Sequence, residues 1–321
     1  MDIEQIQTAA RIINQGGLVA FPTETVYGLG ANALNPLAVA KIFELKERPS
    51  FDPLIVHIAS IGDLNTLTDN VGRNVIRLAE KFWPGPLTIV LPKSKLVPDI
   101  VTSGLNTVGI RMPDNDIALK LIMAANCPIA APSANKFGKL SPVSAEHVKK
   151  QLPNVDYVLD GGHTSVGIES TIVSIEGNVS TLLRPGIITL ADIENALPNM
   201  FIFNAAKPRK LIAPGLLKSH YSPLKPLYIL DNQVFHFSES SGLIVHGRKD
   251  LILPESKIIY TSQSYNQLEI AANLFSALHI MEDDECIKQI FIEPVAEVGL
   301  GVAIMDRIKK AAYKYQQKTN Y

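Results

Sequence analysis

The stretch Leu18-Val-Ala-Phe-Pro-Thr-Glu-Thr-Val-Tyr-Gly-Leu-Gly-Ala-Asn-Ala33 holds the pattern that decides the fold. Its apolar start, Leu18 to Phe21, predicts a short buried strand. Gly28-Leu-Gly30-Ala-Asn-Ala33 fits the Gly-x-Gly-x-x-Ala fingerprint of dinucleotide-binding folds, but that fingerprint follows its strand directly and opens the next helix. Here residues 22–27 intervene, and the helix begins only at Pro36. An NAD-dependent oxidoreductase, which rests on Gly28 and Gly30 alone, is therefore the least favoured alternative.

Strand and helix patterns mix on both sides of this stretch. Ile6, Ala9, Ala10 and Ile13 recur at helical spacing behind a capping box of Asp2 and Gln5. Further helices are predicted over 36–46, 71–82, 115–126, 144–151 and 189–197, and strands over 87–91, 108–112, 129–131, 157–159, 171–175 and 180–183. Glu176-Gly-Asn178 is typical of a hairpin between the last two strands. The pattern predicts an α/β fold with a twisted, mixed, open sheet.

A proline-rich basic segment divides the chain. Residues 206–226 carry five bases, no acid and four prolines, which predicts a semi-rigid linker. It is either a solvated connector or a set of cations lying over an anionic ligand. Beyond it, strands are predicted over 227–230, 243–245, 258–260 and 289–293, and helices over 267–279 and 301–315. We predict a domain over 1–205, the linker over 206–226, and a small, parallel, Rossmann-like α/β domain over 227–321.

Composition excludes several classes of protein. The chain has 321 residues, of which 19% are charged and 46% hydrophobic, so intrinsic disorder is excluded. The longest uncharged run, Thr25 to Ala40, is too short and too polar for a membrane span. An acidic start and only two cysteines, Cys127 and Cys286, favour a reduced, cytoplasmic protein. A net charge of −1 argues against a protein that coats nucleic acid.

Familiar catalytic and metal motifs are missing. The sequence contains no Gly-x-x-x-x-Gly-Lys-Ser/Thr phosphate loop, no Cys-x-x-Cys and no Gly-x-Ser-x-Gly, and its seven histidines are scattered. Small and cationic residues instead gather after predicted strands, where open α/β sheets bind ligands. Each such cluster alone is typical of a turn or a surface ion pair, but Lys46, Arg48, Arg111 and Arg184 together favour a polyanionic ligand.

In their order, these clusters resemble the threonylcarbamoyl-AMP synthase family, the YrdC-like enzymes of tRNA modification. The matching strings are Phe21-Pro-Thr-Glu-Thr-Val-Tyr-Gly-Leu-Gly30, Lys46-Glu-Arg48-Pro, Pro53-Leu-Ile-Val-His57, Trp83-Pro-Gly-Pro-Leu-Thr88, Arg111-Met-Pro, Ala131-Pro-Ser-Ala-Asn135, Asp160-Gly-Gly-His163, Glu169-Ser170-Thr171 and Leu183-Arg-Pro-Gly186. The linker string Ala213-Pro-Gly-Leu-Leu-Lys-Ser-His-Tyr-Ser-Pro223 and the domain after it resemble the long, two-domain form.

The resemblance implies a YrdC-like catalytic domain and a nucleotidyltransferase reaction. L-threonine, bicarbonate or CO2, and ATP would give threonylcarbamoyl-AMP and pyrophosphate. The adenylate would pass to a tRNA threonylcarbamoyl transferase complex for the t6A modification at position 37 of tRNAs that read codons beginning with A. Mg2+ would accompany ATP, with no metal site of the protein's own evident, and weak binding of tRNA or double-stranded RNA is a further expectation.

Residue roles follow from the same resemblance. Lys46 and Arg48 would be catalytic, because an anionic carbamate needs charge neutralisation and alignment more than a general base. L-threonine would be bound by Thr25, His57, Arg111, Ala131 and Ser170. ATP would be bound by Arg48, Asp52, Thr107, Ser133, Asn135, Ser141 and Arg184.

Two departures from the family pattern bear on the nucleotide. Leu216-Leu-Lys218-Ser219 replaces the usual Met-Lys-Tyr-Arg/Lys, which puts an aromatic contact near Lys218 in question. Asp52 stands where relatives carry Asn, and an acid there favours a metal-bridged phosphate contact. We predict that residues 206–226 fold over the nucleotide and shield the adenylate from water. The alternative from another class is a double-stranded RNA or tRNA-binding module, whose binding would need no threonine and would weaken steeply with salt.

Overall fold

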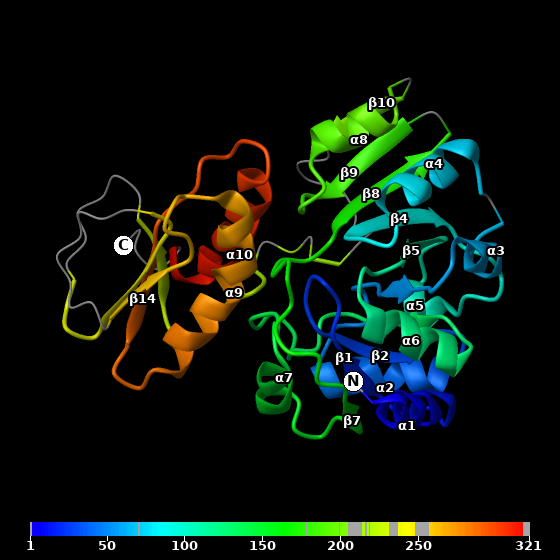
Figure 1. Cartoon of the computed structure of the whole chain (residues 1–321), viewed down its shortest axis with the longest axis horizontal. Helices are drawn as coiled ribbons and strands as arrows, with labels where there is room; N and C mark the ends of the chain where they lie inside the picture. Colours follow the sequence, from blue (N-terminus) through cyan, green and yellow to red (C-terminus); the bar gives the residue numbers. More distant parts are fainter. Residues whose placement is uncertain are drawn as a thin grey trace.

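A computed structural model describes residues 2–69, 71–177, 179–198, 200–204, 214–215, 217, 219–230, 237–247 and 257–316. Figure 1 shows two α/β domains side by side, the larger one at the right and the C-terminal one at the left. The larger domain contains α1 (Ile3–Asn14), β1 (Val19–Phe21), β2 (Gly28–Asn32), α2 (Pro36–Lys46), β3 (Ile55–His57), η1 (Ile61–Asp63), α3 (Leu64–Leu67), α4 (Arg73–Phe82), β4 (Leu87–Pro92), α5 (Asp99–Thr102), β5 (Thr107–Arg111), α6 (Asp116–Ala125), β6 (Ile129–Ala130), α7 (Ala145–Gln151), β7 (Tyr157–Val158), β8 (Thr171–Glu176), β9 (Val179–Arg184), α8 (Leu190–Ala196) and β10 (Phe201–Asn204).

The larger domain is built on one mixed sheet, which confirms the predicted fold class. Within the described residues its strand order is β10-β9-β8-β4-β5-β3-β6-β2-β1-β7. β8 and β9 pair antiparallel as the predicted hairpin, whereas β3 pairs parallel with β5 and β4 parallel with β8. The predicted capping box of α1 is present, because Asp2 caps the helix and Gln5 accepts from the Asp2 amide.

Sequence patterns missed β2, and its position settles the role of its glycines. Gly28 and Gly30 lie in this strand, which pairs antiparallel with β1, so they form no phosphate-binding turn. A Cβ atom at Gly30 would lie 2.7 Å from the ring of Phe21 and 2.8 Å from Ile129. The glycine is therefore required by close packing within the sheet.

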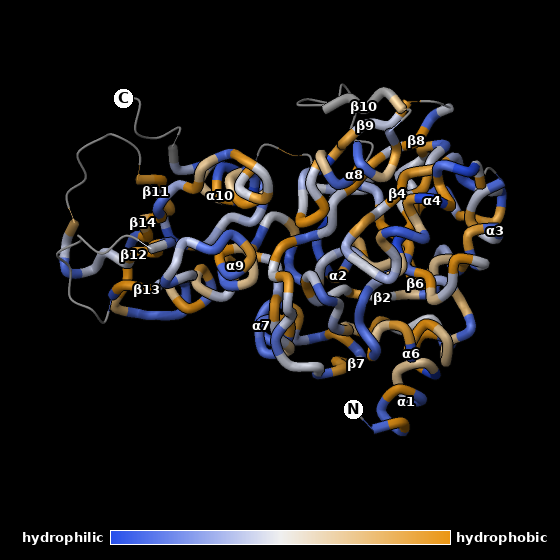
Figure 2. Tube along the Cα trace, turned by 45° about the horizontal axis from the view of Figure 1, so that its top comes forward, coloured by the Kyte–Doolittle hydropathy of each residue, from blue (hydrophilic) through white to orange (hydrophobic). Residues whose placement is uncertain are grey.

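Strand alternation gives the sheet two different faces. Even-numbered residues of β1 and β6, such as Ala20 and Ala130, pack in the large core with α2, α4 and α8. Val19, Phe21 and Ile129 face the opposite side, where α1 and α6 cover them. Figure 2 shows hydrophobic residues, in orange, on strands and helices of both domains.

The second face is not covered by α1 and α6 along its whole length. Over β3, β4, β8 and β9 it carries a small cluster of Ile55, Val90, Ile172 and Leu183, with no helical residue among its members. The same parity places His57 and Arg111 on this face, because they lie two residues from Ile55 and Gly109. This open part of the sheet is the platform on which ligands can bind.

The C-terminal domain contains β11 (Leu227–Ile229), β12 (Ser241–Val245), β13 (Ile258–Tyr260), α9 (Gln267–Asp283), β14 (Gln289–Ile292) and α10 (Gly301–Gln316). Its strands are all parallel, in the order β11-β14-β12-β13, which confirms the predicted parallel sheet. Residues of α9 and α10 share one apolar core with Val26, Leu140, Val143 and Ile168 of the larger domain. The two domains are thus joined by a continuous hydrophobic contact. No helix among the described residues is long and apolar enough to cross a bilayer.

A histidine stack lies in this domain contact. His279 of α9 stacks on His147 of α7 with ring centroids 3.7 Å apart, and its Nε2 lies 3.1 Å from the carbonyl oxygen of Ser141. Burial lowers the pKa of His279 from 6.5 to about 4 despite the nearby Asp283, which forms an ion pair with Lys150. The stack is therefore neutral at physiological pH.

Acid should weaken the fold through this stack. Between pH 6.5 and 4 the unfolded chain binds a proton at His279 that the native protein does not, so stability falls as pH falls through this window. The linkage is worth about 2 kcal/mol for His279 at pH 5 relative to pH 7.5. Urea unfolding at the two pH values should show a smaller loss in His279→Asn than in the wild type, whereas equal losses would contradict the assignment.

Candidate active site

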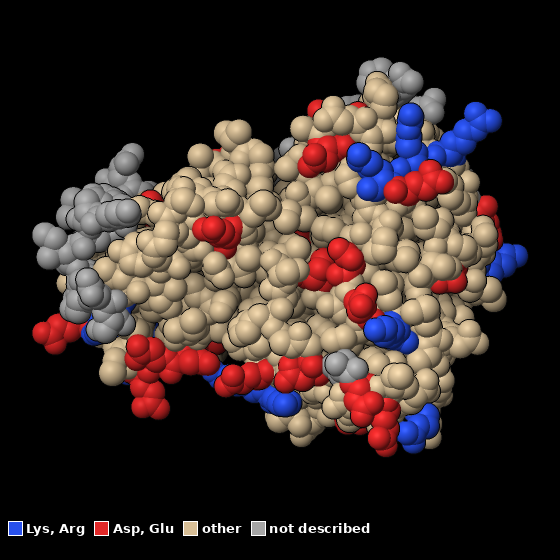
Figure 3. Space-filling view, viewed as in Figure 1, with Lys and Arg blue, Asp and Glu red and all other residues tan. Residues whose placement is uncertain are grey.

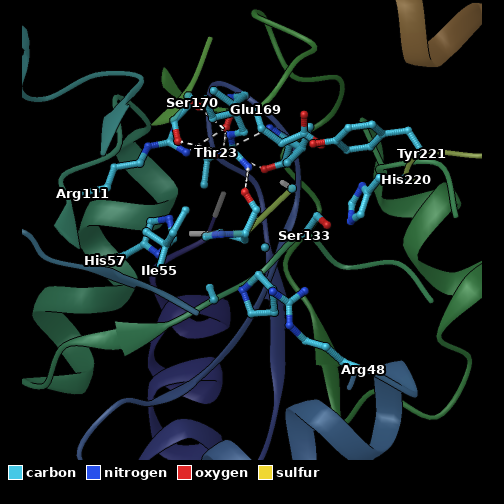
Figure 4. Close-up of a pocket in the computed structure, with 18 residues that line it drawn as sticks. Thr23, Arg48, Ile55, His57, Arg111, Ser133, Glu169, Ser170, His220 and Tyr221 are labelled. Carbon is cyan, nitrogen blue, oxygen red and sulfur yellow. Dashed lines mark hydrogen bonds between the residues drawn. The ribbon is translucent and has the colours of Figure 1, made fainter. Parts of the chain in front are cut away.

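A cavity opens on the uncovered face of the large sheet, and linker residues form part of its wall, with His220 and Tyr221 at the right in Figure 4. Its walls come from the loop between β1 and β2, the segment after α2, strands β3 and β5, the segment after β6, the two ends of the hairpin β8–β9, and the linker. It is lined by Thr23, Thr25, Val26, Gly28, Arg48, Ile55, His57, Arg111, Ala131, Pro132, Ser133, Glu169, Ser170, Arg184, Pro214, Gly215, His220 and Tyr221. Residues from almost the whole length of the larger domain therefore meet at one place.

All five residues predicted to bind L-threonine line this cavity, namely Thr25, His57, Arg111, Ala131 and Ser170. Arg111 donates from Nη1 to the hydroxyl of Thr25 over 3.0 Å. The hydroxyls of Ser170 and Thr88 lie 2.8 Å apart. Burial, aided by Arg111, lowers the pKa of His57 to about 3, so its imidazole is neutral and can donate or accept a hydrogen bond.

Glu24 is a part of this site that the sequence analysis did not single out. Its carboxylate lies 2.6 Å from Nη2 of Arg111, and both side chains are buried. Among the described residues, Nε of Arg111 and Nδ1 of His57 have no hydrogen-bond partner. Buried polar atoms normally find partners, so these two atoms mark a place for a polar ligand.

Arg48 and Arg184 bring two cationic groups to the wall of the cavity. Arg48 donates from Nε to the carbonyl oxygen of Asp52 over 3.0 Å and from Nη2 to that of Pro53 over 2.9 Å. Arg184 donates from Nε to the carbonyl oxygen of Ser170 over 3.0 Å. These backbone contacts fix the plane of each guanidinium before any ligand arrives.

Lys46 lies beneath the cavity instead of on its wall. Its side chain is buried, and Nζ donates to the carbonyl oxygens of Ser133 and Asn135, each over 2.5 Å. Burial and the neighbouring Arg48 hold the pKa of Lys46 well below its usual value. In this geometry Lys46 fixes the loop that carries Ser133, and a direct contact with phosphate stays a prediction.

The predicted ATP residues do not all reach the cavity. Three of them line it, namely Arg48, Ser133 and Arg184, and three do not, namely Asp52, Asn135 and Ser141. Thr107 lines a smaller neighbouring cavity, and Ile55 and Pro214 line both cavities. Asp52 pairs with Arg48 over 3.0 Å, Asn135 donates to the carbonyl oxygens of Lys136 and Lys139, and Ser141 donates to Glu169 over 2.5 Å. Their direct contact with ATP stays a prediction.

The described part of the linker lies against these cations. The carbonyl oxygen of Pro214 accepts a hydrogen bond from Arg184 over 3.3 Å, and His220 and Tyr221 are buried in the cavity wall. Burial, with Arg48, holds the pKa of His220 well below its usual value. Lys218 and residues 205–213 lie outside the described residues, so the prediction at Lys218 is not addressed.

The carboxylates next to the cavity are already paired. Asp52 is held by Arg48 and Glu169 by Arg307, and the described residues contain no group of three or more His, Cys, Asp or Glu side chains that could hold a metal. The protein therefore presents cations, and no cluster of carboxylates, to an incoming ligand.

Comparisons with known proteins agree with this geometry. The family model described as "Telomere recombination" (Sua5/YciO/YrdC) matches residues 11–186, and the model described as "Threonylcarbamoyl-AMP synthase, C-terminal domain" matches residues 188–313. The chain belongs to the threonylcarbamoyl-AMP synthase family. It has the two-domain form of this enzyme family, as its resemblance predicted.

Two named relatives and one solved structure match this chain over almost its full length and theirs. The threonylcarbamoyl-AMP synthases of Pyrococcus abyssi and Bacillus subtilis are each 42% identical to the chain, over 96% of its length and over 94% and 93% of theirs. The crystal structure of P. abyssi Sua5 complexed with L-threonine superposes with a TM-score of 0.87 at 40% identity, covering 98% of this chain and 96% of that one. The synthase family thus shares both domains with this protein.

Proposed function

We propose that the protein is an L-threonylcarbamoyladenylate synthase, which makes threonylcarbamoyl-AMP and pyrophosphate from L-threonine, bicarbonate or CO2, and ATP. The observation that carries the proposal is the convergence of Thr25, His57, Arg111, Ala131 and Ser170 with Arg48 and Arg184 in one cavity. The L-threonine complex of the P. abyssi relative supports it. The product would supply t6A formation at position 37 of tRNAs that read codons beginning with A, through a tRNA threonylcarbamoyl transferase complex.

The cavity is lined by one group of residues suited to an amino acid and another suited to phosphates. Nε of Arg111 would donate to the threonine carboxylate, and the neutral His57 would hydrogen-bond a polar group of the same substrate. Arg48 and Arg184 would bind the phosphates of ATP. Because the carboxylates of Asp52 and Glu169 are occupied by arginines, Mg2+ would enter bound to ATP.

The reaction needs alignment and charge neutralisation. N-carboxythreonine forms when the neutral amine of L-threonine adds to CO2, which makes the N–C bond and releases the amine proton to solvent. A carbamate oxygen of this anion attacks the α-phosphorus, an O–P bond forms, and the bond from the α-phosphorus to the bridging oxygen breaks, so pyrophosphate leaves with the electron pair. The nucleophile is already an anion and requires no side-chain base. Arg48 and Arg184, which backbone carbonyls hold in place, neutralise the charge that builds up on the phosphates.

Pyrophosphate release from ATP tests the proposal. The purified protein should release pyrophosphate only when L-threonine and bicarbonate are both present, and mass spectrometry should detect threonylcarbamoyl-AMP. Release that does not depend on threonine would contradict it. Salt-sensitive binding of double-stranded RNA without turnover would favour the RNA-binding alternative. On the face shown in Figure 3, acidic side chains lie on both domains, and basic side chains gather beside acidic ones at the upper right without forming a broad basic surface.

A further inference from the structure

Arg307 is a buried cation from the C-terminal domain that reaches the cavity wall. It lies on α10, its side chain is fully buried, and it stands on the apolar face of the helix near Ile304 and Ile308. Charged groups are rarely buried to this degree unless they are paired. Its partners are therefore informative about its role.

The guanidinium of Arg307 makes three contacts on the larger domain. Nε donates to Oε2 of Glu169 over 3.0 Å, Nη2 to the carbonyl oxygen of Glu169 over 3.3 Å, and Nη1 to the carbonyl oxygen of Pro185 over 2.9 Å. One side chain thus holds the two ends of the hairpin β8–β9, because Glu169 lies just before β8 and Pro185 just after β9.

Both anchored residues adjoin cavity residues. Glu169 immediately precedes Ser170, and Pro185 immediately follows Arg184. Arg184 in turn donates from Nη2 to the Ser170 hydroxyl over 3.1 Å. Figure 4 shows Glu169 and Ser170 together at the upper wall of the cavity. A shift of Glu169 or Pro185 would therefore move Ser170, which is predicted to bind L-threonine, or Arg184, which is predicted to bind ATP.

A second contact braces the same carboxylate. Oε1 of Glu169 accepts from the Ser141 hydroxyl, and the carbonyl oxygen of Ser141 lies 3.1 Å from Nε2 of His279 on α9. Burial alone would raise the pKa of Glu169, but Arg307, Arg184 and Ser141 outweigh it and hold that pKa below its usual value. Glu169 is thus an anion held directly by Arg307 of α10 and linked through Ser141 to His279 of α9.

We propose that Arg307 is a positioning residue for the synthase reaction. Through Glu169 and Pro185 it sets the positions of Ser170 and Arg184, so the C-terminal domain completes the active site without touching the substrates. This inference rests on the proposed function. The three donors of the planar guanidinium point to separate acceptors, and a lysine ammonium cannot reproduce that arrangement.

Steady-state kinetics of Arg307→Lys test the inference, because the variant keeps the buried positive charge and removes the planar guanidinium with its three separate donors. The matched control is Lys309→Met, which removes an exposed cation of α10 that pairs with Glu297. We expect Arg307→Lys to raise KM for L-threonine and lower kcat, with kcat/KM at least tenfold below the control. Unfolding midpoints measured in parallel show that both proteins are folded under the assay conditions.

A double-variant cycle separates positioning from general destabilisation. If Arg307 acts through Glu169, the combination of Arg307→Lys with Glu169→Gln should lower kcat/KM little more than the worse single variant. Kinetic constants of Arg307→Lys within twofold of Lys309→Met, or fully multiplicative effects in the cycle, would overturn the inference. A wild-type protein without threonine-dependent turnover would instead refute the proposed function, so the two failures are distinguishable.

Discussion

Replacing Arg48 with alanine should lower kcat/KM for ATP by about a hundred- to a thousand-fold, the usual cost of removing one preorganised donor at a developing charge. Arg48 lines the cavity, and its guanidinium is fixed by the carbonyl oxygens of Asp52 and Pro53. It can therefore stabilise phosphate charge without first being ordered. Initial rates of pyrophosphate release over a range of ATP concentrations measure the effect.

Two controls isolate the catalytic part of this loss. Arg77→Ala removes an exposed arginine of α4 and should leave the rate unchanged. Arg48→Ala also leaves the buried Asp52 unpaired, which destabilises the fold. Adding Asp52→Asn should recover stability without recovering the rate. A rate in Arg48→Ala within threefold of the wild type would show that Arg48 does not act on the phosphates.

Replacing Arg111 with methionine should lower the free energy of unfolding by about 3–5 kcal/mol, because it leaves a buried carboxylate without its partner. That carboxylate belongs to Glu24, which lies 2.6 Å from Nη2 of Arg111. The same change should remove the binding of L-threonine, since the free Nε of Arg111 is the donor available to the substrate carboxylate. Urea unfolding and threonine-dependent pyrophosphate release report the two effects.

A compensating change separates the structural role of Arg111 from its role in binding. In Arg111→Met combined with Glu24→Gln, both charges of this pair are gone and neither leaves an unpaired partner, so most of the lost stability should return. Threonine-dependent turnover should stay absent. Turnover that returned together with stability would show that Arg111 serves the fold alone.

Local patterns were enough to predict most helices and the main strands. The N-cap residue Asn35 and the proline at the first helical position, Pro36, define the start of α2. The side chain of Asn35 accepts hydrogen bonds from the amides of Leu37 and Ala38, as an N-cap residue should. β2 was missed because it is rich in glycine, a residue type depleted in strands. β3 was missed although β1, which is equally short, was predicted from its apolar run.

Sequence motifs predicted which residues gather around the cavity better than which of them line it. Thr25, His57 and Arg111 line it, whereas Lys46 belongs to the same kind of motif and lies beneath it. Motif order does not show whether a side chain faces a ligand or a backbone carbonyl. The role of Arg307 depends on a contact with Glu169, far away in the sequence, and its one local signal is a charge on an apolar helix face.

The two-faced sheet also constrains which changes of length the gene can tolerate. Alternate residues of β5 serve the helix-covered core and the cavity, so removing one codon between Val108 and Ile110 would bring Arg111 into the core and an apolar side chain into the binding site. A deletion of one residue in this strand would therefore abolish both packing and chemistry. Insertions in turns away from the cavity, such as the one at Gly177 between β8 and β9, carry no such penalty, and variation in length should accumulate there.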